Sequence, residues 1–209
     1  HEAFGDLLSL SVTPNYLEQI GFIDINQANK ANEDPIGLLM KKALDGVVIV
    51  PWAIMLDKWR AALFSGKIDE SNLNESWWEL REKYQGIAPP IDRPENFFDP
   101  GAKYHIPANT PYTRYFLASI MQYQFHEALC NAINFDGPLH ECSIYDSKKA
   151  VERVISTMAL GQSVPWQDAF EKLTGSRELS GKSILNYYAP LKNWLDEQNQ
   201  NRTCGWEKS

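Results

Sequence analysis

The chain has 209 residues, of which 44% are hydrophobic and seven are Trp, so it carries enough apolar side chains for a packed core. Its formal net charge of −7 argues against nucleic acid or an anionic membrane as the main partner. No uncharged apolar run approaches the roughly 18 residues that a membrane-spanning helix needs, so we expect no transmembrane segment within the chain.

Helix start and stop signals follow one another along the chain, in the form of capping residues before a Pro and Gly residues at the ends. In chain order, we expect a short helix from Thr13-Pro14, a long one from Asp34-Pro35 through Phe64 that is interrupted at Pro51, and further helices over about Asp69–Tyr84, Tyr112–Ile133, and from Asp146-Ser147 to Gly161, with short helices after Pro165 and Ser180. No hairpin signal and no convincing alternation of apolar and polar residues is present, so the sequence predicts an all-α fold.

The segment from Gly86 to Pro111 departs from this pattern. It contains Pro89, Pro90, Pro94, Pro100, Pro107 and Pro111. Long proline-rich loops are uncommon in compact domains and are often functional. This one also carries Phe97, Phe98, Tyr104 and Ile106, which we expect to be buried. We therefore predict that the loop lines a cleft.

Three cysteines are too few for a disulfide scaffold and do not match a cysteine zinc site. Cys130 and Cys142 could close a short loop, which leaves Cys204 either unpaired or bonded to a residue outside this sequence. The sequons at Asn74 and Asn201 are typical of extracellular chains, and together with the cysteine pair they predict a secreted glycoprotein.

A helical zinc peptidase usually carries the motif H-E-x-x-H. The His-Glu pair occurs three times, at His1, His126 and His140, and in no case does a second His follow at the required spacing. Spacing alone therefore predicts no metal site, and we interpret His126 and His140 as structural residues.

Several segments resemble those of the angiotensin-converting enzyme family, in one register from the first residue to Gly205-Trp206. They are His1-Glu2-Ala3-Phe4-Gly5-Asp6, Trp77-Trp78 with Arg81 and Tyr84-Gln85-Gly86, Phe98 to Pro107 continued by Pro111 to Tyr115, Gln124 to Cys130, and Gly137 to Cys142. The resemblance covers roughly the last third of one catalytic domain of that family. It implies that residues 1–209 are the C-terminal portion of a single peptidase domain, with the H-E-x-x-H helix upstream.

The resemblance implies a zinc site to which this chain contributes one ligand. Glu2 would be the third ligand, beside two His residues from the absent helix, and two His with one Glu leave a coordination position open for water. Asp6, one turn later, would orient a ligating His from the second shell. Without the resemblance, Glu2 is a solvated surface charge and Asp6 part of a helix-face salt bridge.

The resemblance also implies roles for the residues around the proline-rich loop. His105 and Tyr115 would donate hydrogen bonds to the oxyanion, while Lys103 and Tyr112 would bind the free C-terminal carboxylate of the peptide. We expect Lys103 and His105 to share one side of an extended loop, and Tyr112 and Tyr115 to share one face of a helix. Taken in isolation, the tyrosines are core or rim aromatics and His105 is a loop histidine.

Chloride sites are implied at Trp77 with Arg81, one helical turn apart, and at Arg114. A buried cation without a carboxylate partner needs an anion, which is the physical reason for such a site. The alternative for these residues is a structural salt bridge. Three positions depart from the family's common pattern and leave the preference for C-terminal side chains open: Gly46, Ile49 and Ser119.

The fold implied is one lobe of an all-α zinc-peptidase domain with a deep central cleft. The function implied for the complete chain is a zinc-dependent peptidyl-dipeptidase acting on short peptides with a free C-terminus, with chloride as a further cofactor. We expect the isolated fragment to be inactive. Alternatives are a family member that has lost its zinc helix and serves as a binding ectodomain, a carboxypeptidase of the same family that removes one residue, and a helical interaction module unrelated to catalysis.

Overall fold

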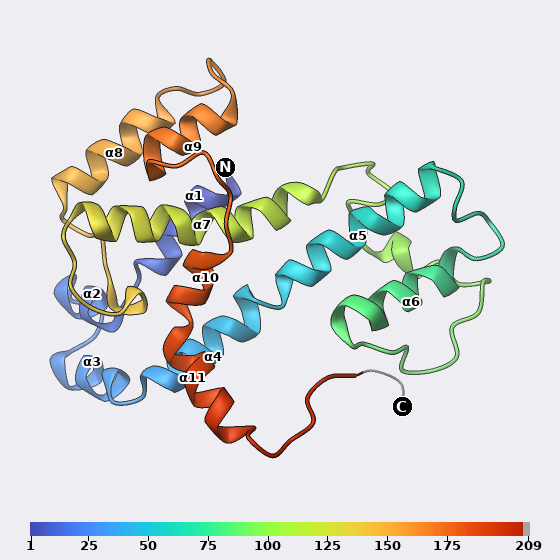
Figure 1. Ribbon diagram of the computed structural model, residues 1–209, viewed down its shortest axis with the longest axis horizontal. Coiled ribbons are helices and arrows are strands. Elements are labelled where there is room, and N and C mark those ends of the chain that lie inside the picture. Colours follow the sequence, from blue (N-terminus) through green and yellow to red (C-terminus); the bar gives the residue numbers. More distant parts are fainter. Residues whose placement is uncertain (207–209) are drawn as a thin grey trace. The chain divides into compact units, whose positions relative to one another are not determined.

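The computed structural model describes residues 1–206, and its regular elements are all helical, as the sequence predicts (Figure 1). In chain order they are α1 (Glu2–Leu10), α2 (Pro14–Gln19), α3 (Ile25–Asn32), α4 (Pro35–Gly46), α5 (Ile49–Phe64), α6 (Leu73–Gln85), the 3-10 turn η1 (Asp99–Ala102), α7 (Thr113–Ala132), η2 (Leu139–Glu141), α8 (Lys148–Met158), α9 (Trp166–Thr174), α10 (Lys182–Tyr187) and α11 (Ala189–Gln198). No strand occurs between residues 1 and 206. None of the helices in this range is both long and apolar enough to cross a membrane.

The helices belong to two compact units. Unit 1 contains His1–Ala43 and Ala118–Gln198, and unit 2 contains Leu44–Leu117 with residues 199–206. The division falls within α4 and α7.

Unit 1 has two clusters of buried apolar side chains. One joins α1 and α7 to the adjacent pair α8 and α9 (Figure 1), and its fully buried members include Leu7, Leu129 and Leu173. The other contains Leu39 of α4 and the tyrosine pair Tyr123 and Tyr188, whose hydroxyl oxygens lie 2.8 Å apart. Unit 1 is therefore built around the second part of α7.

Unit 2 is built on the packing of α5 against α6 (Figure 1). Trp59 of α5 and Trp77 of α6 are buried, and their rings meet edge to face with centroids 5.7 Å apart. The Trp59 indole N–H also has acceptors, because Leu73 O and Ser76 Oγ lie 3.1 and 3.2 Å away. These contacts fix α5 against α6, and the loop that follows α6 packs on this helix pair.

The helix boundaries correct the sequence reading in two places. The long helix is interrupted at Val47-Val48 and not at Pro51, which lies in the first turn of α5. Pro is tolerated there because a first-turn N–H has no partner within its helix. The other correction is α3, which was not predicted although its capping box is visible as Asp24 followed by Gln27: the Asp24 carboxylate accepts from Gln27 N and the Gln27 side chain from Asp24 N, both at 2.9 Å.

The expectation that the loop aromatics are buried is wrong for Phe97, Phe98 and Tyr104, which are 37%, 51% and 71% exposed. Polar contacts, and not buried aromatic rings, hold this part of the loop. The Asp99 carboxylate accepts hydrogen bonds from Trp78 Nε1 at 2.7 Å and from Arg93 Nε at 3.0 Å. The Arg93 hydrogen bonds lower the pKa of Asp99 to about 2, against burial, which raises it.

Candidate functional site

Two charged side chains of α5 hold the loop that precedes α7. Arg60 is 8% exposed, and its guanidinium donates to Thr110 O at 2.7 Å and to His105 O at 3.0 Å. Asp57, one turn earlier, accepts from the backbone N–H groups of Tyr112 at 2.8 Å and Thr113 at 2.6 Å, and from the Thr113 hydroxyl at 2.7 Å. Asp57 therefore caps the N-terminus of α7, where a carboxylate is favourable.

The charge state of Asp57 follows from these contacts. Burial acts to raise the pKa of this carboxyl, but the hydrogen bonds from Thr113 and Tyr112 and the nearby Arg60 guanidinium hold it below its usual value. Asp57 is consequently ionised at neutral pH, and its Oδ1 lies 3.5 Å from Arg60 Nε. Asp57 and Arg60, one turn apart on α5, thus hold both ends of the segment from His105 to Thr113.

His105 and Tyr115 come together at this segment. His105 Nε2 lies 3.2 Å from the Tyr115 hydroxyl, and the two rings are perpendicular with centroids 5.4 Å apart. Desolvation, followed by the positive charges of Lys103, Arg60 and Arg114, lowers the pKa of His105 from its usual value. The imidazole is therefore neutral at pH 7, and the pair presents two polar hydrogen-bonding atoms side by side.

Lys103 and Tyr112 lie next to that pair, although the segment is not extended as we expected. Lys103 is followed by consecutive turns in which Ile106 N bonds to Lys103 O at 2.8 Å and Thr110 N to His105 O at 2.9 Å. Lys103 Nζ lies 5.0 Å from the centroid of the Tyr112 ring, which is 4.8 Å from the His105 ring and 4.6 Å from that of Tyr115. All four predicted residues thus form one cluster, which we call the loop cluster.

Tyr112 is 5% exposed, and its hydroxyl accepts a hydrogen bond from Trp52 Nε1 at 3.2 Å. Because a phenol can donate as well as accept, this bond leaves the hydroxyl hydrogen for another acceptor. The nearest cation to the ring face is Lys103. The loop cluster can therefore offer an ammonium group and a phenol hydrogen to an anion, and an imidazole and a second phenol to a carbonyl oxygen.

Trp77 and Arg81 lie one turn apart on α6, as predicted. The Arg81 guanidinium lies over the ring of Trp52, 4.9 Å from its centroid, and over that of Trp78 at 5.8 Å. Its Nε is buried without a hydrogen-bond partner, and no carboxylate in residues 1–206 pairs with it. Burial lowers the pKa of Arg81 from its usual value, which reflects a desolvated cation lacking a counter-charge. Arg114, by contrast, is exposed at the start of α7.

Glu2 and Asp6 lie in unit 1, both exposed on one face of α1. Burial, and then the charge of Glu2, raise the pKa of Asp6, and Gln122 Nε2 lies 3.4 Å from Asp6 Oδ2. Within residues 1–206, Glu2 makes no hydrogen bond or ion pair, so its carboxylate is available to a ligand from outside the chain. A free carboxylate with an acidic neighbour one turn away fits the part of a zinc site that this chain would supply.

Potential metal ligands also gather in the buried group of His126, Cys130 and Cys142. The two sulfurs form a disulfide with an S–S distance of 2.05 Å, so they are not thiolate ligands. The predicted pairing of Cys130 with Cys142 is thereby confirmed, and Cys204 is free and exposed. His126 lies 2.8 Å from Leu139 O through its Nε2, consistent with the structural role we expected.

The buried position of Asn74 argues against a glycan there on the folded chain. Its side chain is 0% exposed, its Nδ2 donates to Arg93 O at 2.9 Å and Asp99 Oδ2 at 3.1 Å, and its Oδ1 accepts from Asp99 N at 2.9 Å. A glycan replaces one of the two Nδ2 hydrogens and therefore removes one of the two donor contacts, and a sugar does not fit at a fully buried side chain. Asn201 is exposed, and a glycan there stays a prediction.

Asp57 and Arg60 were missed by sequence reasoning, although they hold the loop cluster in place. Their signal is a pair of opposite charges one turn apart in the segment from Ile49 to Phe64, whose other residues are apolar except for the exposed Lys58. Such a pair is also common on exposed helix faces. Only the burial of Arg60 and its hydrogen bonds to backbone carbonyls distinguish this pair from a surface ion pair.

Comparison with known proteins covers almost the whole chain. The family profile described as angiotensin-converting enzyme matches residues 1–206. An angiotensin-converting enzyme of Mesocricetus auratus is 45% identical over 209 residues, which is 99% of this chain and 16% of that protein. One of Theromyzon tessulatum is 44% identical over 207 residues, covering 99% of this chain and 33% of that protein.

A third relative, the angiotensin-converting enzyme-like protein Ace3 of Mus musculus, is 42% identical over 208 residues, or 98% of this chain and 28% of that protein. The chain therefore spans between about a sixth and a third of the length of these relatives.

Proposed function

Because the chain belongs to the angiotensin-converting enzyme family, we propose that the complete protein is a zinc-dependent peptidyl-dipeptidase that releases C-terminal dipeptides from short peptides. The observation that carries the proposal is the loop cluster, in which Lys103, His105, Tyr112 and Tyr115 converge. A cation beside one phenol suits a carboxylate, and an imidazole beside a second phenol suits a developing oxyanion. One cluster thus offers both functions that a carboxypeptidase-type enzyme needs.

Lys103 and Tyr112 bind the substrate in this proposal. The ammonium group attracts the free C-terminal carboxylate, and the Tyr112 hydroxyl donates to it while accepting from Trp52. Because a peptide with an amidated C-terminus lacks that charge, the proposal predicts selectivity for unblocked peptides. The presence of both Lys103 and Tyr112 favours release of a dipeptide over release of a single residue.

His105 and Tyr115 act on the scissile carbonyl. With the proton of the neutral imidazole on Nε2, this N–H and the Tyr115 hydroxyl lie close enough to donate to one oxygen. Such donors stabilise the transition state more than the ground state, because negative charge develops on that oxygen during attack. Arg60 fixes the backbone of His105, so the donors are held before the substrate arrives.

Glu2 would hold the zinc ion together with two His residues from outside this chain, and Asp6 would orient one of them. A zinc ion bound there supplies Lewis-acid polarisation of the peptide carbonyl and activates water. Chloride would bind at Arg81, whose buried Nε has no hydrogen-bond partner and which lacks an acidic partner among the described residues. For Arg114, which is exposed, the family resemblance alone supports a chloride site. Secretion completes the proposal, supported by the Cys130–Cys142 disulfide, because disulfides persist in oxidising compartments.

The test is product analysis with the complete protein and a tripeptide-type substrate whose C-terminus is free. We expect release of the C-terminal dipeptide, loss of activity with a zinc chelator and recovery when zinc is returned. The same peptide with a C-terminal amide should be cleaved at least about tenfold more slowly, since one charge-assisted contact is lost. Release of single amino acids would favour the carboxypeptidase alternative, and no release by a folded, zinc-loaded protein would favour the binding ectodomain.

Chloride is tested by repeating the assay over a range of chloride concentrations at constant ionic strength. Arg81→Met should reduce the chloride response, because it removes the cation and keeps an unbranched apolar chain against Trp52. Lys83→Met is the matched control, since Lys83 is exposed on the same helix. An unchanged response in Arg81→Met would exclude this residue from the chloride site.

A further inference from the structure

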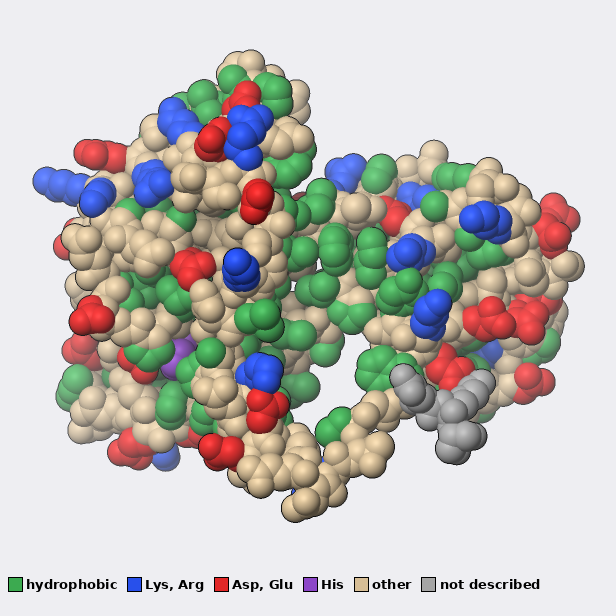
Figure 2. Space-filling model, viewed as in Figure 1, with side chains coloured by type: hydrophobic (Ala, Val, Ile, Leu, Met, Phe, Trp, Pro, Cys, Tyr) green, Lys and Arg blue, Asp and Glu red, His purple; other side chains and the backbone are tan. Residues whose placement is uncertain are grey.

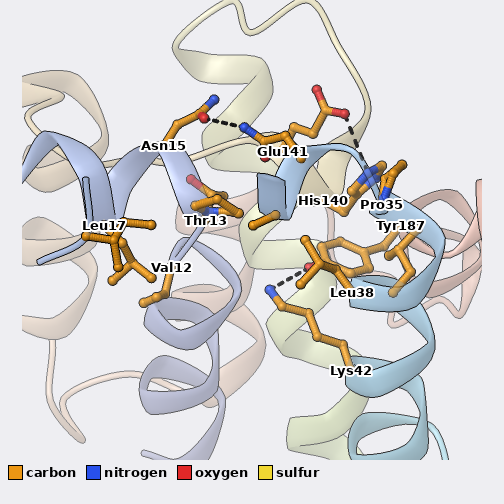
Figure 3. Close-up of a pocket in the computed structure, with 15 residues that line it drawn as sticks. Val12, Thr13, Asn15, Leu17, Pro35, Leu38, Lys42, His140, Glu141 and Tyr187 are labelled. Atoms are coloured by element: carbon orange, nitrogen blue, oxygen red, sulfur yellow. Dashed lines mark hydrogen bonds and ion pairs between the residues drawn. The ribbon is translucent and has the colours of Figure 1, made fainter. Parts of the chain in front are cut away.

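Unit 1 contains a pocket that is separate from the residues assigned above. Its volume is about 370 Å³, and it lies between α2, α3, α4, η2 and the end of α10 (Figure 3). Small-molecule sites typically range from roughly 300 to 1,000 Å³, so this pocket lies at the small end of that range. It has room for a compact ligand and not for a folded segment.

The wall of the pocket is mainly apolar. Its apolar lining residues are Val12, Pro14, Leu17, Ile23, Ala31, Pro35, Leu38 and Leu39. Leu38 projects beside Tyr187 and Lys42 in Figure 3, at the point where the wall changes from apolar to charged. A ligand that fills this pocket therefore needs an aliphatic part.

Lys42 is the cation of the pocket, and it has no carboxylate partner within residues 1–206. Its Nζ donates to the Tyr187 hydroxyl at 3.0 Å (Figure 3). Tyr187 is 1% exposed, and burial followed by the neighbouring Tyr188 raises its pKa above the usual value, so the phenol stays neutral. Tyr187 is thus a dipole and not a counter-ion, and the ammonium charge is uncompensated.

The polar residues on the opposite side do not neutralise Lys42 either. Glu141 lies 3.6 Å from His140 through Oε1 and Nε2, and its side chain is 53% exposed. Desolvation lowers the pKa of His140, so this imidazole is neutral at pH 7, and neither ring nitrogen has a hydrogen-bond partner. The pocket therefore contains an ammonium group without an ion-pair partner, a neutral imidazole without a hydrogen-bond partner, and the partly solvated Glu141 carboxylate beside that imidazole.

A desolvated ammonium without a counter-ion is costly, and an anion bound beside it recovers part of that cost. Burial indeed lowers the pKa of Lys42 from its usual value. A dianion such as phosphate would have to leave water for a mostly apolar wall, whereas a monocarboxylate with an aliphatic chain matches both parts of the pocket. We propose that this pocket binds a small aliphatic monocarboxylate, with its carboxylate at Lys42 Nζ and its chain along the wall formed by Leu17, Leu38 and Leu39.

The experiment is calorimetric titration of the complete protein with sodium octanoate. We expect saturable binding with one site per chain. Acetate, which has the charge alone, and 1-octanol, which has the chain alone, should each bind at least about tenfold more weakly, because each lacks one of the two contributions. Comparable binding of octanol would show that the charge of Lys42 is irrelevant and would overturn the proposal.

Three lysine variants make the assignment specific. Lys42→Met removes the charge and keeps an unbranched apolar side chain, so it should fold and bind octanoate about tenfold more weakly. Lys41→Met should bind normally, because Lys41 is the exposed neighbour on α4 and does not line the pocket. Lys103→Met should also bind normally, which separates this pocket from the carboxylate site of the proposed enzyme.

Leu38→Trp gives a second, independent test, since it narrows the pocket and retains the charge. Weaker binding in both Lys42→Met and Leu38→Trp supports the proposal. Octanoate binding that depends on Lys103 and not on Lys42 would overturn it. Absence of binding by the complete protein would overturn it as well, and would indicate that another part of the chain fills the pocket.

Discussion

At the scale of single residues, the loop cluster combines positions whose polar atoms are held in place by aromatic packing. The rings of His105, Tyr112 and Tyr115 touch one another, so removing one hydroxyl leaves the packing intact. Conservative substitutions therefore separate the chemistry of these residues from their structural role.

Tyr115→Phe keeps the ring and removes the hydroxyl that lies 3.2 Å from His105 Nε2. We expect kcat to fall by roughly 10²- to 10³-fold with little change in KM, because this donor acts mainly in the transition state. The measurement is steady-state dipeptide release by the complete protein. Tyr104→Phe is the control, since Tyr104 also packs against His105 but is 71% exposed, and it should leave kcat unchanged. Equal kcat values for the two variants would contradict the role of Tyr115.

At the scale of secondary-structure elements, α5 determines where the loop cluster lies. Arg60 and Asp57 bond to backbone groups on both sides of the turns that carry His105. The loop has no helix or strand of its own between η1 and α7, so its conformation depends on these bonds. Arg60 is accordingly a positioning residue and not a catalytic one.

Arg60→Met removes the bonds to His105 O and Thr110 O and preserves much of the apolar stem. We expect the free energy of unfolding to fall by about 2–4 kcal/mol, because two carbonyls lose charge-assisted donors. We also expect kcat to fall at least tenfold as the donors lose their alignment. Urea unfolding and dipeptide release measure the two effects, and Lys58→Met, an exposed site on the same helix, is the control. A destabilised variant with unchanged kcat would show that the loop finds its position without Arg60.

The helices were largely predictable because their signals are local. Thr13-Pro14 indeed begins α2, and Gly86 ends α6 in a left-handed conformation with φ of 65°. The approximate helix of residues 112–133 is α7. What the sequence did not reveal depends on contacts far apart along the chain: Arg60 reaches His105 across 45 residues, and Asn74 is buried by Arg93 and Asp99. Likewise, Phe98 and Tyr104 stay exposed because polar bonds, and not their own burial, hold the loop.

At the scale of the whole molecule, the charged side chains are distributed over the surface, whereas the one disulfide among the described residues links two segments that are close in sequence. Acidic and basic side chains are interspersed over the face shown in Figure 2. The disulfide joins the end of α7 to the residue after η2, with a sequence separation of 12. It restricts the unfolded chain within unit 1.

Replacing both Cys130 and Cys142 with Ala should lower the free energy of unfolding by about 3 kcal/mol, since a loop of this size loses roughly that much closure entropy when cross-linked. Thermal unfolding under non-reducing conditions measures the change. Cys204→Ala should have no effect, because Cys204 is free and exposed. A similar loss of stability in all variants would show that the disulfide itself contributes little.

Stability should also decrease as the pH falls below about 6.5, the usual pKa of His. Desolvation lowers the folded-state pKa of His126 and of His140, so in that window the unfolded chain binds protons that the folded chain does not. Urea midpoints at pH 7.5 and 5.5 measure the effect. The double variant His126→Gln and His140→Gln should show a smaller pH dependence, and an unchanged slope would assign the effect to other groups.

The burial of Asn74 has a consequence for cells in which the chain passes through a compartment with N-glycosylation enzymes. These enzymes modify an Asn-x-Ser/Thr site only while it is accessible, and Asn74 becomes inaccessible once α6 packs under Arg93 and Asp99. A sugar attached before that step would prevent α6 from packing in this way. The fraction of chains that carry sugar at Asn74 therefore depends on the rate of oligosaccharide transfer relative to the rate at which unit 2 folds. Measuring that fraction would report how fast unit 2 folds in the cell.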